Sequence, residues 1–151
     1  MAAEIERKFL VAGDGWKAQA GESTDIRQAY LATTDKASVR VRIRDDAEAV
    51  LSIKSAVPGT TRAEFEYDIP LEDARQLMQL RGGGMIEKRR YTVVNGKATW
   101  EIDVFGGAHK GLVIAEIELP SAQASFERPS WLGEEVTDDK RYYNATLARD
   151  S

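Results

Sequence analysis

The sequence predicts an α+β fold in which an antiparallel sheet dominates. Most of the 151 residues alternate between apolar and polar side chains with the period of two that is typical of strands. The dipeptide Asn95-Gly96 separates two such segments and is a strong signal for a β-hairpin. The length is typical of one domain, so we expect a single domain over residues 1–151.

Eight alternating segments are expected to be strands. In chain order they are residues 4–12, 24–33, 38–45, 48–55, 61–69, 86–94, 98–105 and 112–119. Turn residues separate several of them: Asp45-Asp46-Ala47 joins the third to the fourth, and Pro58-Gly59 precedes the fifth. Because a sheet of this size can close on itself, the predicted architecture is an eight-stranded antiparallel β-barrel with flanking helices.

Helices are expected at three places outside the strands. The first begins at Pro70, has acidic residues in its first turn, runs to about Leu80 and stops at Gly82-Gly83-Gly84. Two shorter helices are expected over 121–127, after a proline, and over 140–149. No internal repeat, low-complexity tract or linker interrupts this order, which agrees with one domain.

The composition excludes several classes of site. There is no cysteine, so disulfides, thiolate metal sites and cysteine nucleophiles are excluded. His109 is the only histidine, which argues against a histidine-rich zinc site and a Ser-His-Asp triad. The net charge of −4 argues against general nucleic-acid binding. No apolar run suits a transmembrane helix and the first residues do not resemble a signal peptide, so we expect a cytoplasmic protein without a membrane partner.

The polar face of each predicted strand is nearly all ionised, and each strand carries one sign of charge over most of that face. The acidic sets are Glu4 and Glu6, then Glu64, Glu66 and Asp68, then Glu101 and Asp103, then Glu116 and Glu118. The basic sets are Lys8, then Arg40, Arg42 and Arg44, then Lys54, then Lys88 and Arg90. One explanation is a solvated outer face with cross-strand ion pairs.

A charged interior is the explanation that the sequence favours. Neighbouring like charges repel unless something bridges them, and glutamate gains little on a plain exposed strand. Charges on the inner face of a barrel need compensation, because lone buried ions are very costly. Arginine and lysine match phosphate oxygens, and acidic clusters that offer only oxygen suit Mg²⁺ or Mn²⁺. These residues therefore predict a site for a metal and an oligophosphate.

The pattern resembles the CYTH superfamily, also called triphosphate tunnel metalloenzymes. The first strand holds the Glu-x-Glu-x-Lys hallmark as Glu4, Glu6 and Lys8. Matching segments follow in order: Gln28-Ala29-Tyr30-Leu31, Arg42-Ile43-Arg44, Lys54, Glu64-Phe65-Glu66, Glu87-Lys88-Arg89-Arg90-Tyr91, Glu101-Ile102-Asp103, Glu116-Ile117-Glu118 and Val136-Thr137-Asp138-Asp139-Lys140-Arg141-Tyr142. The resemblance covers essentially the whole chain and is greatest to short bacterial members that look like inorganic triphosphatases.

The resemblance implies a tunnel of eight antiparallel strands and a role for each matching residue. The implied metal-binding acids are Glu4, Glu6, Glu116 and Glu118, with Glu64, Glu66 and Asp103 nearby. The implied phosphate-binding cations are Lys8, Arg42, Arg44, Lys54, Lys88 and Arg90, with Lys140 reaching the phosphates from the C-terminal segment. Tyr30 is implied to face the tunnel, and Arg40 lies outside the shared motif. The resemblance also implies a homodimer.

The function that the resemblance implies is metal-dependent hydrolysis of a triphosphate, with inorganic tripolyphosphate yielding pyrophosphate and phosphate. The catalytic candidates are Lys88, Lys8 and Tyr30; a lysine crowded by another lysine has a lowered pKa and can act as a base. Glu64, Glu66 and Asp103 are alternative groups for orienting the water. A class IV-type adenylate cyclase, a thiamine triphosphatase and a non-catalytic polyphosphate- or nucleotide-binding module remain alternatives, although the intact acidic pairs favour catalysis.

Overall fold

A computed structural model describes residues 5–55, 63–121 and 123–151. Its core is one antiparallel sheet of nine strands in the order β5-β4-β3-β2-β6-β7-β8-β1-β9. The strands are β1 (Ile5–Val11), β2 (Ala20–Thr33), β3 (Ala37–Arg44), β4 (Glu48–Ser55), β5 (Glu64–Ile69), β6 (Ile86–Asn95), β7 (Ala98–Phe105), β8 (Val113–Leu119) and β9 (Leu132–Glu135). The helices are α1 (Leu71–Met78), α2 (Asn144–Arg149) and the 3-10 turns η1 (Gly15–Gln19), η2 (Gly107–His109) and η3 (Lys140–Tyr142).

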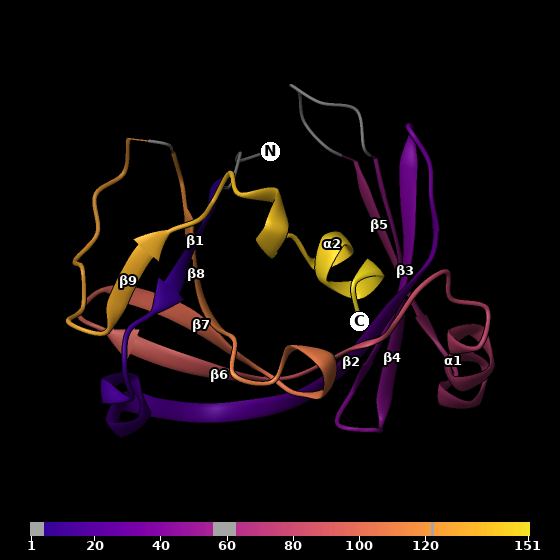
Figure 1. The fold of residues 1–151 in the computed structure, drawn as a ribbon, viewed down its shortest axis with the longest axis horizontal. Helices are drawn as coiled ribbons and strands as arrows, with labels where there is room; N and C mark the ends of the chain where they lie inside the picture. The colour runs from indigo at the N-terminus through magenta and orange to yellow at the C-terminus, as the bar shows by residue number, and fades with distance from the viewer. Residues whose placement is uncertain (1–4, 56–62, 122) are drawn as a thin grey trace.

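The predicted α+β class with an antiparallel sheet is confirmed, but the strand count and the closure differ. The sheet curls so that β1, β8 and β9 stand opposite β3, β4 and β5 (Figure 1). Its two ends are β5 and β9, and within the described residues no strand pairing joins them into a closed barrel. The ninth strand, β9, lies on the far side of β1 and adds the edge that the prediction lacked.

Two of the three helix predictions need correction. The residues described within 121–127 form no helix. Instead, Phe126 packs edge-on against Phe9 and Trp100, and this packing favours an extended segment that covers the sheet. The predicted helix over 140–149 is divided into η3 and α2, because Tyr143 between them has an extended backbone. The helix that follows Pro70 forms as predicted, over Leu71–Met78.

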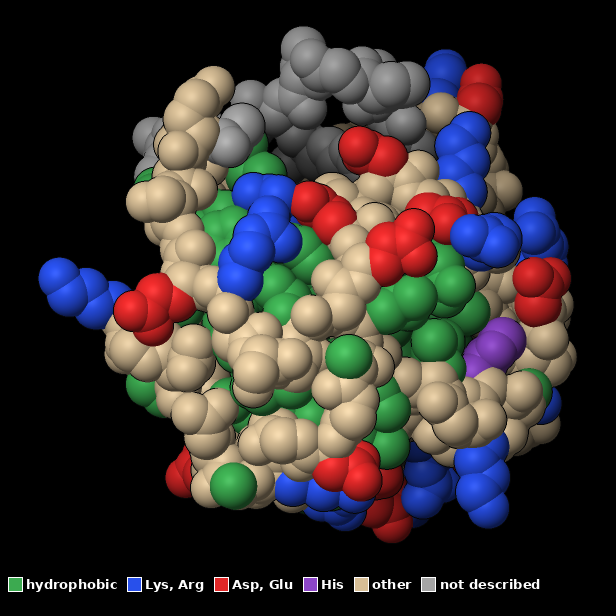
Figure 2. Space-filling model, turned by 60° about the vertical axis from the view of Figure 1, so that its left-hand side comes forward, with side chains coloured by type: hydrophobic (Ala, Val, Ile, Leu, Met, Phe, Trp, Pro, Cys, Tyr) green, Lys and Arg blue, Asp and Glu red, His purple; other side chains and the backbone are tan. Residues whose placement is uncertain are grey.

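Apolar side chains on the outer face of the sheet form two cores. One lies over β1, β6, β7 and β8, where Trp100 meets Trp131, and η1 and the segment before β9 cover it. The other lies under α1, where Ala74 and Met78 pack on Val41 and Ala29. In a space-filling view from the side of β9, hydrophobic side chains remain visible among the charged ones (Figure 2). The outer face is therefore apolar, which leaves the charged set for the concave face.

The C-terminal helix α2 lies inside the curl of the sheet (Figure 1). Leu147 and Ala148 pack against Ile86, Phe105 and Ile114, which share the inner face with the charged residues further along the same strands. One end of the concave face is thus apolar and covered, and the other end holds the ionised side chains. No helix in the described part of the chain has the length and apolar character needed to cross a bilayer.

Candidate active site

The inner face of the sheet buries charged and polar side chains that are usually exposed in soluble proteins. The buried members are Lys8, Gln28, Arg42, Ser52, Lys88, Asp103 and Glu116. For these residues, the explanation that the charges lie on a solvated outer face is wrong. On β5, Glu66 and Asp68 are exposed although they are cross-strand neighbours of inner-face positions on β4. The concave face is therefore the candidate site, because buried charges need partners, ligands or both.

On the wall formed by β6 and β7, cations and carboxylates neutralise one another. Lys88 Nζ donates to Asp103 Oδ2 at 2.7 Å. Arg90 donates from Nε to Asp103 Oδ1 at 2.8 Å and from Nη2 to Oδ2 at 2.9 Å. Its third nitrogen, Nη1, lies 2.8 Å from Glu101 Oε2. Because Arg90 and Asp103 are cross-strand neighbours, the register of the hairpin sets this network.

The pKa values on this wall follow from burial and pairing. Burial raises the pKa of Asp103, but Lys88 and Arg90 outweigh burial and bring it to about 2. Burial lowers the pKa of Lys88 below its usual range, while Asp103 opposes that change. Burial also lowers the pKa of Arg90, but Asp103 and Glu101 raise it overall. Asp103 thus stays ionised between two cations, which leaves its oxygens engaged and less suited to a metal than the prediction assumed.

An acidic pair marks the junction of β1 and β8. Glu6 stands opposite Glu118, and Lys8 stands opposite Glu116. Burial, followed by the charge of Glu116 and a hydrogen bond with it, raises the pKa of Glu6 to about 7. Lys8 Nζ lies 3.6 Å from Glu116 Oε1 and donates to the backbone oxygen of Tyr142 at 3.1 Å. Two carboxylates that compete for one proton are a donor set that a divalent cation fits.

Most of the predicted metal-binding acids lie within the described residues. Within them, no three acidic or histidine side chains converge closely enough to hold an ion by themselves. Glu4 lies outside the described residues. The pair Glu6 and Glu116 offers two carboxylates, and Mg²⁺ in proteins commonly combines one or two carboxylates with substrate phosphates. Of the other predicted acids, Glu64 borders a cavity together with Glu6, and Glu64, Glu66 and Glu118 are all exposed.

On the wall formed by β3 and β4, the cations have no such carboxylate partners. No carboxylate in the described part of the chain lies within 4 Å of the charged groups of Arg40, Arg42, Arg44 or Lys54. Arg42 Nε donates to Gln28 Oε1 at 2.8 Å, a neutral partner. Burial and the nearby arginines, chiefly Arg40, lower the pKa of Arg42 to about 10. Uncompensated positive charge of this kind favours an anion.

A cavity of ≈440 Å³ lies between this wall and the acidic pair. Its lining includes Glu6, Lys8, Tyr30, Arg40, Lys54 and Glu64, and the segment 137–145 forms another side. Lys8 and Tyr30, two of the three predicted catalytic residues, therefore border one space. Lys88 does not border it and is only 3% exposed, against Asp103.

Several predicted phosphate-binding cations lie away from this cavity. Arg42, Arg44 and Arg90 do not border it, and Lys140 is exposed in η3. Conversely, Arg40, Ser52 and Gln28 were missed as site residues. The alternation could have placed Arg40 and Ser52 on the inner face. Arg40 lies two residues from Arg42, and Ser52 lies two residues from Lys54, so each points to the same side of its strand as that cation.

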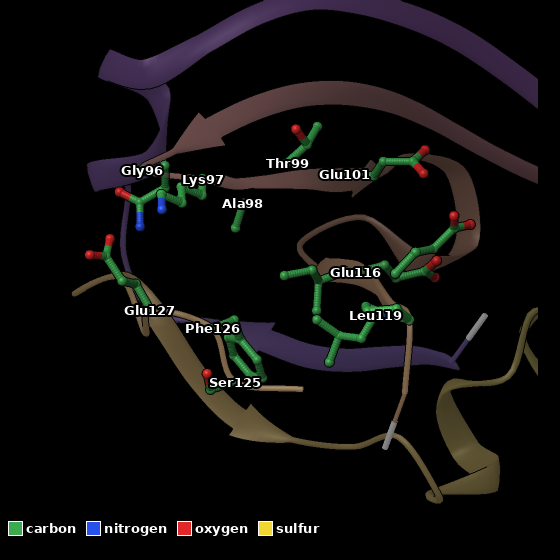
Figure 3. Close-up of a pocket in the computed structure, with 14 residues that line it drawn as sticks. Gly96, Lys97, Ala98, Thr99, Glu101, Glu116, Leu119, Ser125, Phe126 and Glu127 are labelled. Carbon is green, nitrogen blue, oxygen red and sulfur yellow. The ribbon is translucent and has the colours of Figure 1, made fainter. Parts of the chain in front are cut away.

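A second hollow of ≈1030 Å³ opens where β7 and β8 diverge. Glu101 and Glu116 lie toward one end, and Gly96 and Glu127 lie toward the other (Figure 3). Lys97 is the one cation among its described lining residues, against four glutamates. This charge balance does not suit phosphate, so the smaller, cation-lined cavity is the better oligophosphate site.

Comparisons with known proteins match this chain to one family over nearly its full length. A family description, the CYTH domain, matches residues 2–148. The chain is 43% identical over 150 residues to an inorganic triphosphatase of Acetivibrio thermocellus, covering 99% of this chain and 95% of that protein. It is 40% identical over 151 residues to an inorganic triphosphatase of Nitrosomonas europaea, covering 96% of each. A crystal structure of the inorganic triphosphatase NE1496 is 37% identical and superposes with a TM-score of 0.77, covering 100% of this chain and 97% of that one.

Proposed function

The chain belongs to the CYTH domain family, and we propose that it hydrolyses inorganic tripolyphosphate to pyrophosphate and orthophosphate with a divalent metal ion. The relatives from Acetivibrio thermocellus and Nitrosomonas europaea are inorganic triphosphatases. The observation that carries the proposal is the cavity that brings Glu6, which is hydrogen-bonded to Glu116, together with Lys8, Arg40 and Lys54. It offers carboxylates for a metal beside cations for a phosphate chain.

The metal would be held by Glu6 and Glu116, with Glu4 as a further ligand, and Mg²⁺ or Mn²⁺ suits these oxygen donors. When bound, it supplies charge neutralisation on the phosphate oxygens. Metal binding by Glu6 requires its deprotonation, which the neighbouring Lys8 and Lys54 assist. A module that only bound phosphate would have no use for two carboxylates that repel each other and the substrate.

The cations of β3 and β4 would bind and orient the phosphate chain. Lys54 borders the cavity directly, and Arg42 and Arg44 add positive charge along the same face. Lys8 borders the cavity and lies 3.6 Å from Glu116, so it would bind phosphate oxygens close to the acidic pair. Positioning and electrostatic stabilisation supply most of the catalysis in phosphoryl transfer, and this arrangement provides both.

The water must attack in line with the bond that breaks, and its oxygen ends on the released orthophosphate. Tyr30 and Glu64 border the cavity and are placed to orient this water. Lys88 is a third candidate, since burial lowers its pKa, although its amine is bound to Asp103 in this structure. The role of Lys88 is tested by measuring how tripolyphosphate turnover depends on pH in the variant Lys88→Ala. An unchanged pH profile excludes Lys88 as the base.

A phosphate-release panel tests the function. Tripolyphosphate, ATP, thiamine triphosphate and pyrophosphate are each supplied with Mg²⁺ or Mn²⁺, and with no metal. We expect release from tripolyphosphate above the others, only with metal, and lost in Glu6→Gln. Formation of cyclic nucleotide from ATP would identify a cyclase, and preference for thiamine triphosphate would identify that substrate instead. If no phosphate is released from any of the four, the protein is a binding module and the proposal is wrong.

A further inference from the structure

The segment 136–143 runs from β9 into the curl of the sheet and forms one side of the ≈440 Å³ cavity (Figure 1). Both of its ends are bound to Lys8. At its start, the backbone N–H of Val136 donates to the backbone oxygen of Lys8 at 2.8 Å, and the N–H of Lys8 donates to Thr137 Oγ1 at 3.0 Å. At its end, Lys8 Nζ donates to the backbone oxygen of Tyr142 at 3.1 Å. The direction of the Lys8 amine therefore depends on where this segment lies.

The start of the segment is also held from outside the cavity, by a chain of three side chains. Arg7 Nε donates to Glu135 Oε2 at 2.9 Å, and Arg7 Nη2 donates to the other oxygen of the same carboxylate. Glu135 Oε2 accepts a second hydrogen bond from Thr137 Oγ1 at 2.6 Å. Because the Thr137 hydroxyl has one proton, it donates to Glu135 while it accepts from the Lys8 N–H. The chain Arg7–Glu135–Thr137 thus ends on a residue that borders the cavity.

Arg7 and Glu135 have the properties of a rigid anchor. A two-pronged arginine–carboxylate pair fixes the orientation of both groups. The guanidinium carbon of Arg7 also lies 5.6 Å and 5.0 Å from the ring centroids of Phe9 and Phe126. The hydrogen bond from Arg7 is the main reason why the pKa of Glu135 is lowered to about 2, so this carboxylate stays ionised near neutral pH. Neither Arg7 nor Glu135 borders the cavity, so their effect on a substrate passes through the segment.

We propose that Arg7, Glu135 and Thr137 are positioning residues, which fix the segment 136–143 and thereby hold the Lys8 amine toward the phosphate chain. The proposal rests on the proposed function for the identity of the substrate. Lys8 Nζ has three protons, of which one goes to the backbone oxygen at the end of the segment, so the others are available for an anion while the segment is in place. A displaced segment moves that oxygen, and the amine moves with it.

The first test is the turnover of tripolyphosphate with Mg²⁺ in variants of the chain. We expect Glu135→Gln and Thr137→Val each to lower kcat/KM by about 10- to 100-fold, because a misplacement of about 1 Å in a site can cost two orders of magnitude. Thr137→Ser keeps the hydroxyl and should stay within about threefold of wild type. Arg75→Gln is the control: it breaks an exposed arginine–carboxylate pair with Asp46, away from the cavity, and should leave kcat/KM unchanged.

A second test asks whether Glu135 acts through Lys8. In the variant Lys8→Met, which has no amine, the further change Glu135→Gln should alter kcat/KM by less than about threefold, because the group to be positioned is absent. Calorimetric titration with tripolyphosphate gives the same comparison as a ratio of Kd values, so the test does not depend on residual turnover. Partly exposed ion pairs contribute little to stability, so Glu135→Gln should fold as wild type does, which circular dichroism checks.

The outcomes separate this inference from the proposed function. If wild type hydrolyses tripolyphosphate and Glu135→Gln has the kcat/KM of Arg75→Gln, the positioning role is wrong and the hydrolase proposal stands. An equal loss with and without the Lys8 amine would show that Glu135 acts on the fold as a whole, and the positioning role would again be wrong. If wild type releases no phosphate but Glu135→Gln weakens tripolyphosphate binding only when Lys8 is present, the hydrolase proposal fails and the positioning role stands. A wild type that neither hydrolyses nor binds tripolyphosphate contradicts both. Should Thr137→Val not fold, Glu135→Gln gives the decision.

Discussion

On the β6–β7 wall the cations are held by carboxylates of the chain itself, whereas on the β3–β4 wall the cations have none within 4 Å in the described residues. Lys88 and Arg90 share Asp103, and Arg90 also contacts Glu101. Arg40 and Lys54 instead border an open cavity. The same residue types thus have two environments: on the paired wall their charges are neutralised within the chain, and on the unpaired wall the positive charge favours an external anion.

The difference between the two walls follows from the cost of burying charge. Taking a charge out of water is costly, and a buried charge persists only when another charge or a ligand compensates it. On the paired wall the compensation is internal, so it contributes to the folded state without a ligand. On the unpaired wall, burial and then repulsion from the neighbouring arginines lower the pKa of Arg42 to about 10. Binding an anion relieves that repulsion, so the two walls should respond in opposite ways to mutation.

The largest expected effect is on stability, from breaking the paired wall. Asp103→Ala leaves Lys88 and Arg90 without their shared carboxylate, and Asp103 is only 1% exposed. We expect a loss of about 3–5 kcal/mol in the free energy of unfolding, measured by urea denaturation. The control is Asp14→Ala, which breaks the exposed pair with Lys17 and should cost less than about 1 kcal/mol. Equal losses in the two variants would show that this wall is no scaffold.

The next effect is on catalysis, from the acidic pair between the two walls. Glu6→Gln keeps the shape of the side chain but removes a metal-binding charge. We expect the rate of tripolyphosphate hydrolysis to fall at least as much as the roughly 10- to 100-fold that changes around metal ligands cost. The unfolding free energy should not fall, because a repulsion is removed. Full activity in this variant at saturating metal would remove Glu6 from the proposed site.

The same pair predicts a pH dependence of stability in the metal-free protein. The pKa of Glu6 is raised from its ordinary value of 4.5 to about 7 in the folded protein, chiefly by burial, so the folded state binds the proton more tightly. Stability from this group is therefore greatest at low pH and falls as pH rises between about 4.5 and 7, by on the order of 1–3 kcal/mol. Asp103 and Glu135 titrate near pH 2, outside this window. Thermal unfolding at pH 5 and 7.5 should show the fall in wild type and a smaller one in Glu6→Gln.

The smallest expected effect is on stability, from the unpaired wall. Arg44→Gln removes a cation that has no ion-pair partner in the described residues, so we expect a change in unfolding free energy within about 0.5 kcal/mol. Its affinity for tripolyphosphate should nevertheless weaken. Urea denaturation and calorimetric titration measure the two quantities on one sample. A loss of stability comparable with that of Asp103→Ala would break the comparison between the walls.

The sequence by itself determined which face of each strand carries the charges. Alternation is a local property with a period of two, so Glu6 and Lys8, or Arg42 and Arg44, are placed on one face without knowledge of the fold. It also located eight strands within a few residues and the helix after Pro70. The motif around Glu6 and Lys8 predicted a metal and phosphate site only together with the charged faces of the other strands, because few ligands satisfy both signs of charge.

Only the tertiary structure decided which charges neutralise one another. The strand order brings β6 beside β7, and the register of the two strands places Asp103 next to Lys88 and Arg90. The sequence pattern had instead indicated that Asp103 lies near a metal. The edge strand β9 gains its hydrogen bonds from β1, so its four residues show no local signal. The packing of α2 inside the curl leaves Arg40 beside the cavity and Lys88 away from it. Partners depend on distant pairing and packing, which alternation along one strand does not encode.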